Sequence, residues 1–181
     1  MVRAVFLDRD GTINKDPGYF HEPDKFLFER NAVEGLKRLS SMGYLLIVVQ
    51  NQSGIGRGMF TEKDTRAVNS RISSELSALG VKIEGFYYCP HTPEEKCSCR
   101  KPLPGLILKA AEDFGVELDG SWMAGDKSTD VNAAENVRKA GHRGFRSIGL
   151  LTGCALGDGK SSPDMVAVDL LEAAEKLRKL G

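Results

Sequence analysis

The sequence lacks a net charge, a long apolar run and a recognisable signal peptide. Its 181 residues carry 25 lysines and arginines against 25 aspartates and glutamates, which excludes a broadly basic nucleic-acid binder or an acidic tail protein. The longest unbroken apolar run covers residues 44–49, whereas a membrane-spanning helix needs about 20 residues. Residues 1–7 have the pattern of a strand rather than a leader. We therefore expect a cytoplasmic protein without a membrane or nucleic-acid partner.

Disorder is also excluded, because 41% of the residues are hydrophobic and the charged residues are of mixed sign. A chain of this length can bury about 70% of its unfolded surface, which is enough to build a core without disulfides. We expect residues 1–181 to form a single domain with one small loop insertion and to act as a monomer.

Apolar runs of strand length alternate with helical patterns along the chain. Strands are predicted at 4–7, 44–49, 84–88, 121–124 and 147–151. Helices are predicted after Asn31, Thr61 and Pro104 and at 130–140 and 170–180. The pairs Asn31/Glu34 and Thr61/Asp64 have the spacing of helix caps. This alternation predicts an α/β fold with a doubly wound, mostly parallel sheet, whose ligands bind beyond the carboxyl ends of the strands.

Two carboxylates, Asp8 and Asp10, follow the first predicted strand. Like charges this close to a buried strand end are costly unless a cation lies between them. A hard divalent ion such as Mg²⁺ would serve, and Gly11 would let the backbone turn away. The alternative for this segment is a solvated Asp-Gly turn.

Three further segments follow later strands. Residues 50–58 form a polar, glycine-rich loop whose backbone could surround an anion. Arg100 and Lys101 could face a phosphate, and Asp126 could complete a Mg²⁺ site, with Asp130 capping the next helix or orienting a cation. Taken singly, these segments also fit an ordinary loop, a surface basic pair and a helix cap. Together, at the ends of successive strands, they indicate metal-assisted phosphoryl transfer.

These motifs resemble those of the haloacid dehalogenase (HAD) phosphohydrolase superfamily. The resemblance extends over most of the chain. At residues 6–14, 18–19, 51–55, 89–91, 99–102 and 104–105 it is more specific and points to the heptose bisphosphate phosphatases. It implies a HAD-like Rossmannoid fold without a large cap domain. It also implies Mg²⁺-dependent removal of the 7-phosphate from a small sugar substrate, D-glycero-D-manno-heptose 1,7-bisphosphate.

The resemblance implies a role for each matching residue. Asp8 would attack the phosphorus and form an aspartyl phosphate, and Asp10 would act as general acid and then as general base. Lys101 would neutralise charge on the transferring group. Mg²⁺ would be held by Asp8, the carbonyl oxygen of Asp10 and Asp126. The implied substrate-binding residues are Asp16, Gly18, Tyr19, Gln50, Asn51, Gln52, Ser53, Arg100 and Lys127.

Position 50 departs from the family pattern, in which the second motif ordinarily begins with Thr or Ser. Gln50 offers an amide donor instead of a hydroxyl group. Losing one such donor can cost on the order of 2.7–4 kcal/mol of transition-state stabilisation. One alternative is therefore a weakly active or non-catalytic member that binds sugar phosphates.

A second cluster of ligands occupies residues 89–99. Cys89, His91, Cys97 and Cys99 offer three thiolates and one imidazole, which suits a tetrahedral, structural Zn²⁺ site. We expect this loop to fix the position of Arg100 and Lys101, which follow it directly. The resemblance implies that it replaces a cap domain and leaves the site open. Cys154 stands alone, and we expect it to be a small packing or surface residue.

Two other functions compete with this hypothesis. Histidinol-phosphate phosphatases share the acids and the spacing of the zinc loop, whereas residues 53–58 and the pair Pro104-Gly105 favour the heptose substrate. A phosphorylated receiver domain also places an aspartate at a strand end. Such domains lack a second acid two residues later and carry no zinc loop.

Overall fold

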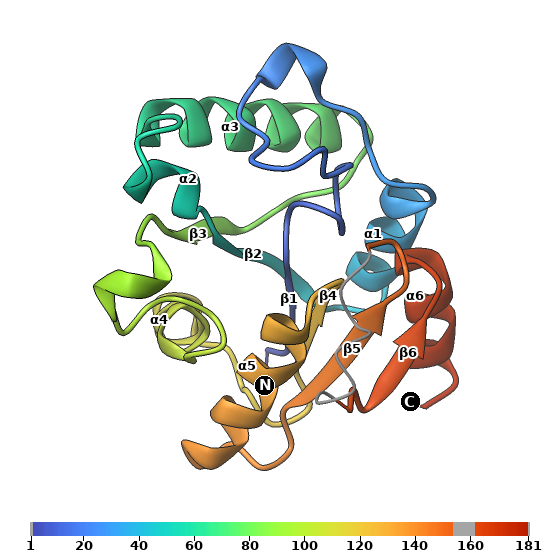
Figure 1. The fold of residues 1–181 in the computed structure, drawn as a ribbon. Coiled ribbons are helices and arrows are strands. Elements are labelled where there is room, and N and C mark those ends of the chain that lie inside the picture. The colour runs from blue at the N-terminus through green and yellow to red at the C-terminus, as the bar shows by residue number, and fades with distance from the viewer. Residues whose placement is uncertain (1, 154–161, 181) are drawn as a thin grey trace.

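The computed structural model describes residues 2–153 and 162–180. Its centre is a parallel sheet of six strands in the order β3-β2-β1-β4-β5-β6 (Figure 1). The strands are β1 (Ala4–Leu7), β2 (Leu45–Asn51), β3 (Gly85–Cys89), β4 (Trp122–Gly125), β5 (Arg146–Leu150) and β6 (Met165–Ala167). The first five confirm the predicted strands with small shifts at their ends. The sequence analysis did not predict β6.

Helices cover both faces of this sheet. They are α1 (Ala32–Ser41), α2 (Ser53–Gly56), α3 (Glu62–Ala78), α4 (Gly105–Phe114), α5 (Ser128–Lys139) and α6 (Leu170–Arg178), with short 3₁₀ helices η1 (Pro23–Lys25) and η2 (Pro93–Glu95). Helices α1, α3 and α6 pack on one face, and α4 and α5 pack on the other. The predicted doubly wound α/β fold is therefore confirmed.

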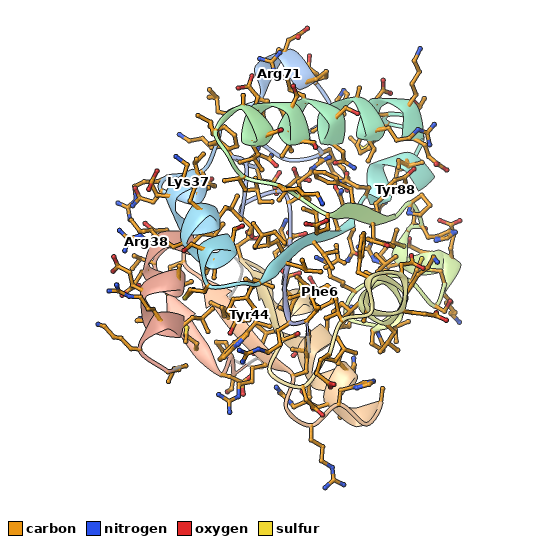
Figure 2. All side chains as sticks on the ribbon, turned by 180° about the vertical axis from the view of Figure 1, so that it is seen from behind. Phe6, Lys37, Arg38, Tyr44, Arg71 and Tyr88 are labelled. Carbon is orange, nitrogen blue, oxygen red and sulfur yellow. The ribbon has the colours of Figure 1, made fainter. Side chains whose placement is uncertain are left out.

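The alternation of side chains along β1 supplies both cores. Val5 and Leu7 belong to the core under α1, α3 and α6, whereas Ala4 and Phe6 belong to the core under α4 and α5. All four side chains are fully buried, as expected for a central parallel strand. Figure 2 shows Phe6 in the interior, while Lys37 on α1 extends outward.

The strand order reverses at β1, which pairs with β2 on one side and β4 on the other. This reversal is the topological switch point where doubly wound folds bind ligands. The described connections at this edge are loops and short helices, and none of them forms a separate cap domain. None of the described helices is long and apolar enough to cross a membrane.

The two predicted helix caps had different outcomes. Thr61 and Asp64 form a capping box at the start of α3, with the side chain of each bonded to the backbone of the other. Asn31 makes no side-chain cap for α1, so that prediction was wrong. Its backbone is left-handed, with φ 58°, and its Nδ2 atom donates to Asp169 Oδ2 at 2.8 Å. The Asn31 amide therefore links α1 to the cap of α6.

Because α1 packs closely on α6, replacing a glycine of α1 with alanine is expected to destabilise the protein, although alanine normally stabilises a helix. A Cβ atom at Gly35 would overlap the backbone of Leu170. Gly35→Ala should therefore lower the free energy of unfolding by about 1–2 kcal/mol, although alanine favours a helix by about 1 kcal/mol. Ser40→Ala, at an exposed position of the same helix, is the matched control and should be neutral or slightly stabilising. Equal denaturation midpoints for the two variants would contradict this packing.

Candidate active site

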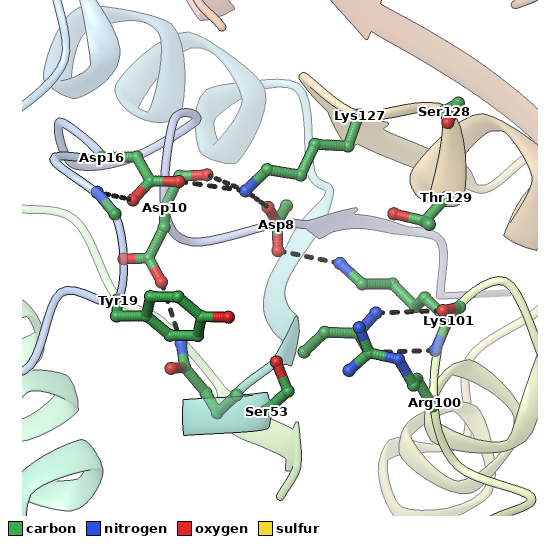
Figure 3. A pocket seen from close by; sticks show the side chains of 13 residues that line it. Asp8, Asp10, Asp16, Tyr19, Ser53, Arg100, Lys101, Lys127, Ser128 and Thr129 are labelled. Carbon is green, nitrogen blue, oxygen red and sulfur yellow. Dashed lines mark hydrogen bonds and ion pairs between the residues drawn. The ribbon is translucent and has the colours of Figure 1, made fainter. Parts of the chain in front are cut away.

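A cavity of about 440 Å³ opens where β1, β2 and β4 end (Figure 3). It collects side chains that are far apart in the sequence. Among the predicted site residues, its walls contain Asp8, Asp10, Asp16, Gly18, Tyr19, Asn51, Gln52, Ser53, Arg100, Lys101 and Lys127. Ser128 and Thr129, which the sequence analysis did not single out, also line it. The parallel topology therefore gathers most of the predicted residues around one hollow.

A buried ammonium group lies between two carboxylates at the base of this cavity. Lys101 Nζ donates to Asp8 Oδ1 at 2.8 Å and lies 2.7 Å from Asp130 Oδ1. Burial alone would lower the pKa of Lys101, but the charges of Asp130 and Asp8 outweigh it and raise the pKa. Burial opposes ionisation of Asp8, yet Lys101 and Lys127 hold its pKa below the ordinary value. Asp8 is thus an anion, oriented by Lys101.

Asn51 fixes the backbone that carries Lys101. Its Nδ2 atom donates to the carbonyl oxygen of Lys101, and its Oδ1 atom accepts from the Lys101 amide, each at 3.0 Å. This pair of bonds joins the end of β2 to the loop before α4. The position of the Lys101 backbone therefore depends on the last residue of β2.

Lys127 reaches the cavity from the segment between β4 and α5. Its Nζ atom lies 3.1 Å from Asp16 Oδ2, 3.9 Å from Asp8 Oδ2 and 3.5 Å from the carbonyl oxygen of Asp10. Burial would lower the pKa of Lys127, but the charges of Asp8, Asp126 and Asp16 raise it. A second cation therefore faces the nucleophile predicted at Asp8.

Three acidic side chains form a group that fits a divalent cation. Oxygen atoms of Asp8, Asp126 and Asp130 lie within 4.8 Å of one another, and all three residues are buried. Asp126 Oδ1 has no hydrogen-bond partner, and burial together with the charge of Asp8 raises the Asp126 pKa to about 7. A side chain at Gly11 would overlap the Asp126 carboxylate. An unpartnered, buried carboxylate among hard oxygen ligands suits Mg²⁺.

Asp10 is surrounded by hydrogen-bond donors. Arg9 reaches both carboxylate oxygens, with Nε 2.9 Å from Oδ1 and Nη2 3.0 Å from Oδ2. Asn14 Nδ2 donates to Oδ1 at 2.9 Å, and Gln52 Nε2 donates to Oδ2 at 2.8 Å. The side chain is still 13% exposed and lines the cavity.

Gln50 lies behind the cavity rather than on its wall. It is 1% exposed and is not among the described residues that line the hollow. Its Nε2 atom donates to Asn69 Oδ1 at 3.1 Å, and its Oε1 atom accepts from Gln52 Nε2 at 2.8 Å. The residue that departs from the family pattern is thus directed towards α3.

Residues 16–19 form an exposed rim of the cavity. The backbone amide of Gly18 donates to Asp16 Oδ1 at 2.8 Å, and Tyr19 is 45% exposed. His21 Nδ1 donates to the carbonyl oxygen of Tyr19 at 2.7 Å, and its ring stacks on Phe60. The tyrosine ring therefore stands at the cavity mouth on a segment fixed by local bonds.

The four Cys and His side chains predicted to bind zinc converge in the loop after β3. Their ligand atoms lie within 4.8 Å of one another, and neighbouring pairs are 3.4–3.5 Å apart. Atoms about 2.0–2.3 Å from one tetrahedral centre have nearly this separation, so the four residues fit Zn²⁺. Arg100 Nη1 donates to the carbonyl oxygen of His91 at 3.2 Å, which ties the arginine on the cavity wall to this loop.

The sequence analysis missed part of the site. Arg9 is fully buried and donates to Asp10. Its only indication in the sequence is that it is a basic residue between two aspartates. Asn69 lies in the middle of α3, where no motif marked it. Asp130 was suggested either as a helix cap or as the partner of a cation. It has both roles, because it pairs with Lys101 and its Oδ2 atom also accepts from the Lys127 amide at 3.1 Å. Cys154 lies outside the described residues.

The raised pKa of Asp126 predicts a pH-dependent stability of the metal-free protein. The folded state keeps the Asp126 proton up to about pH 7, whereas the unfolded chain loses it near pH 3.9. Stability from this group is therefore lost as pH rises between these values. In EDTA, Asp126→Asn should be more stable than the parent protein at pH 8, by up to a few kcal/mol. Urea titrations should show this advantage vanishing towards pH 4; a constant difference would contradict it.

Comparisons with known proteins agree with this geometry. A family model described as HAD-hydrolase-like matches residues 98–173. The D-glycero-beta-D-manno-heptose-1,7-bisphosphate 7-phosphatase of Yersinia pestis is 44% identical over 140 residues, which cover 74% of each chain. The Pasteurella multocida enzyme of the same name is 44% identical over 144 residues, covering 76% of this chain and 78% of the relative.

A solved structure is similar over nearly the whole length. The D,D-heptose 1,7-bisphosphate phosphatase from B. bronchiseptica, complexed with magnesium and phosphate, has a TM-score of 0.88 and 29% identity. The match covers 99% of this chain and all of that one. The chain therefore belongs to the HAD-like phosphatases, in the family of the heptose-bisphosphate 7-phosphatases.

Proposed function

We propose that this chain is a Mg²⁺-dependent phosphatase that removes the 7-phosphate from D-glycero-β-D-manno-heptose 1,7-bisphosphate. The observation that carries the proposal is the position of Asp8. Its carboxylate lies in a cavity beside the buried Lys101 ammonium group and an acidic group suited to a divalent cation. The names of the relatives, at 44% identity, supply the substrate.

Asp8 acts as the nucleophile. Its unprotonated oxygen attacks the phosphorus in line, forming a bond to phosphorus while the bond to the sugar oxygen breaks. Lys101 and Lys127 balance the negative charge of the phosphoryl group, because both ammonium groups lie near Asp8. Asn51 holds Lys101 in place through its two backbone contacts.

Asp10 moves the protons. As general acid it donates a proton to the departing sugar oxygen, and as general base it then takes one from the water that attacks the aspartyl phosphate. The second step releases inorganic phosphate and restores Asp8. The partly exposed Asp10 side chain, at the cavity wall, supports both transfers.

Mg²⁺ would be held by Asp8, the carbonyl oxygen of Asp10 and Asp126, and it would supply positive charge to the transferring phosphoryl group. Asp130 orients Lys101 and does not need to bind the ion itself. The unpartnered oxygen of Asp126 supports this assignment.

The cavity rim binds the sugar and its second phosphate. Arg100 offers a guanidinium group for the distal phosphate, and Asp16, Gly18 and Tyr19 stand over the opening. Asn51, Gln52 and Ser53 add polar contacts from the end of β2 and the start of α2. A hollow of about 440 Å³ without a cap domain supports a small substrate.

Phosphate release from matched substrates tests this function. The chain should hydrolyse heptose 1,7-bisphosphate with a kcat/KM on the order of 100-fold or more above that for histidinol phosphate, because the rim residues would contact only the sugar. Phosphorus NMR should show the 1-phosphate retained in the product. EDTA and Asp8→Asn should each abolish turnover.

Other results would select an alternative. Faster hydrolysis of histidinol phosphate would identify a histidinol-phosphate phosphatase. Binding of the heptose bisphosphate without turnover, relieved by Gln50→Thr, would identify a binding member of the family. Full activity of Asp8→Asn would remove Asp8 as nucleophile.

We also propose that Cys89, His91, Cys97 and Cys99 hold a structural Zn²⁺ ion that fixes the loop carrying Arg100. Metal analysis should find about one zinc per chain. Cys97→Ser should lower this content and raise KM more than it lowers kcat, because Arg100 loses its support while Asp8 and Asp10 keep theirs. Ser98→Ala, in the same loop, is the matched control and should retain zinc. An unchanged KM in zinc-depleted Cys97→Ser would contradict this role.

We further propose that residues 1–181 act as a single-domain monomer in the cytoplasm, without nucleic-acid or membrane partners. The balanced charge of 25 basic and 25 acidic residues supports this proposal. Both described cores share one sheet, which supports a single domain.

A further inference from the structure

Asp10 closes a ring of hydrogen bonds with four buried polar side chains. Starting from Asp10, the ring runs through Gln52, Gln50 and Asn69 to Arg9 and back to Asp10. The contacts are 2.8–3.1 Å long. Arg9, Gln50, Gln52 and Asn69 are each at most 6% exposed. The ring joins the ends of β1 and β2 to the middle of α3.

The hydrogen bonds of this ring can be assigned their donors and acceptors in only one consistent way. A carboxylate only accepts hydrogen bonds and a guanidinium group only donates them. Gln52 must therefore present its nitrogen to Asp10, and this same nitrogen also donates to Gln50 Oε1. Gln50 then presents its own nitrogen to Asn69 Oδ1, which also accepts from Arg9 Nη1 at 3.0 Å. The single oxygen of Asn69 thus accepts from both the Gln50 amide and the arginine.

Gln50 and Asn69 depend on each other. The Gln50 side chain is long enough to reach α3 and contact Asn69, and it leaves its oxygen for Gln52. A threonine or serine hydroxyl at position 50 would stand closer to the β2 backbone and could not repeat both contacts. The glutamine and the asparagine therefore act as one unit.

We propose that Asn69 is a positioning residue for Asp10, acting through Arg9 and through Gln50 and Gln52. This inference rests on the proposed function, in which Asp10 is the general acid and base. Asn69 is not among the described residues that line the active-site cavity, but it borders a separate hollow between α3 and β3. It therefore affects the reaction without touching the substrate.

The position of Asn69 within α3 argues against a purely structural role. Val68 and Ile72 beside it are buried and apolar, as the core face of an amphipathic helix requires. An asparagine placed there costs free energy unless its polar atoms are bonded. Its bonds go to the two chains of contacts that end on Asp10.

The leaving group distinguishes positioning of Asp10 from general stability. An alkyl oxygen, as in a sugar phosphate, needs a proton when it departs, whereas p-nitrophenolate leaves without one. Misplacing the general acid should therefore slow only the first kind of substrate. The ratio of kcat/KM for the alkyl phosphate to that for p-nitrophenyl phosphate measures this effect. Each kcat/KM value includes only the steps up to and including departure of the leaving group.

Asn69→Leu, which has similar volume and no acceptor, is the test variant of the Mg²⁺-loaded enzyme. It should lower this ratio on the order of 10- to 100-fold. Asn69→Asp, which keeps an acceptor oxygen, should restore most of the ratio. Ser73→Ala, in the same helix and bordering the same hollow, should leave it unchanged. If Asn69→Leu does not fold, Asn69→Ala takes its place.

Asp10→Asn separates this inference from the proposed function. If Asp10→Asn lowers the ratio but the apolar Asn69 variant leaves it unchanged, or slows both substrates equally, Asn69 does not position Asp10 and the inference is wrong. The inference also fails if Asn69→Asp is as impaired as the apolar variant. If Asp10→Asn itself leaves the ratio unchanged, the role proposed for Asp10 is wrong, independently of Asn69.

Discussion

The ion pairs of Lys101 are the interaction on which the site depends. Asp8, Asp126 and Asp130 place three carboxyl groups within 4.8 Å in a buried space, where uncompensated charge is costly. One ammonium group between Asp8 and Asp130 offsets part of this repulsion. Burial, to which the charge of Asp8 adds, raises the pKa of Asp126 to about 7 and that of Asp130 to about 6. A divalent cation bound at these oxygen atoms would offset the repulsion that remains.

The parallel sheet brings these charges together. β1 is buried on both faces, so polar chemistry is possible only beyond its end. Leu7 and Ala124 are paired across β1 and β4, so the residues that follow these two strands emerge side by side. Asp8 and Asp126 are 118 positions apart in sequence, yet their carboxylates meet at one edge. The connection after β3 then brings Lys101 to the same edge through its contacts with Asn51.

This geometry explains which parts could be predicted from the sequence. Asp8, Asn51 and Asp126 lie at or just after the ends of apolar strands. The apolar strand pattern and the position at the strand end both identify them as candidate site residues. β6 has three residues and no lasting pattern. Asn69 was hidden because one polar residue in an amphipathic helix has many possible partners, and only the packing of α3 on β2 selects Gln50. Asn31 had the residue type of a cap, but its left-handed backbone and its contact with Asp169 depend on how α1 meets α6.

Gln50 shows how one substitution can move a residue from one side of a site to the other. A short hydroxyl group at the end of β2 would remain close to the strand, whereas the longer amide contacts Asn69 on α3 and Gln52. Ser53, Ser128 and Thr129 are then the described aliphatic hydroxyl groups on the cavity wall, beside the phenolic hydroxyl of Tyr19. The departure from the family motif therefore leaves no side-chain donor of position 50 on the cavity wall and places a buried amide behind Asp10. A motif residue cannot be assigned a role from its position alone, because side-chain length decides which partners it reaches.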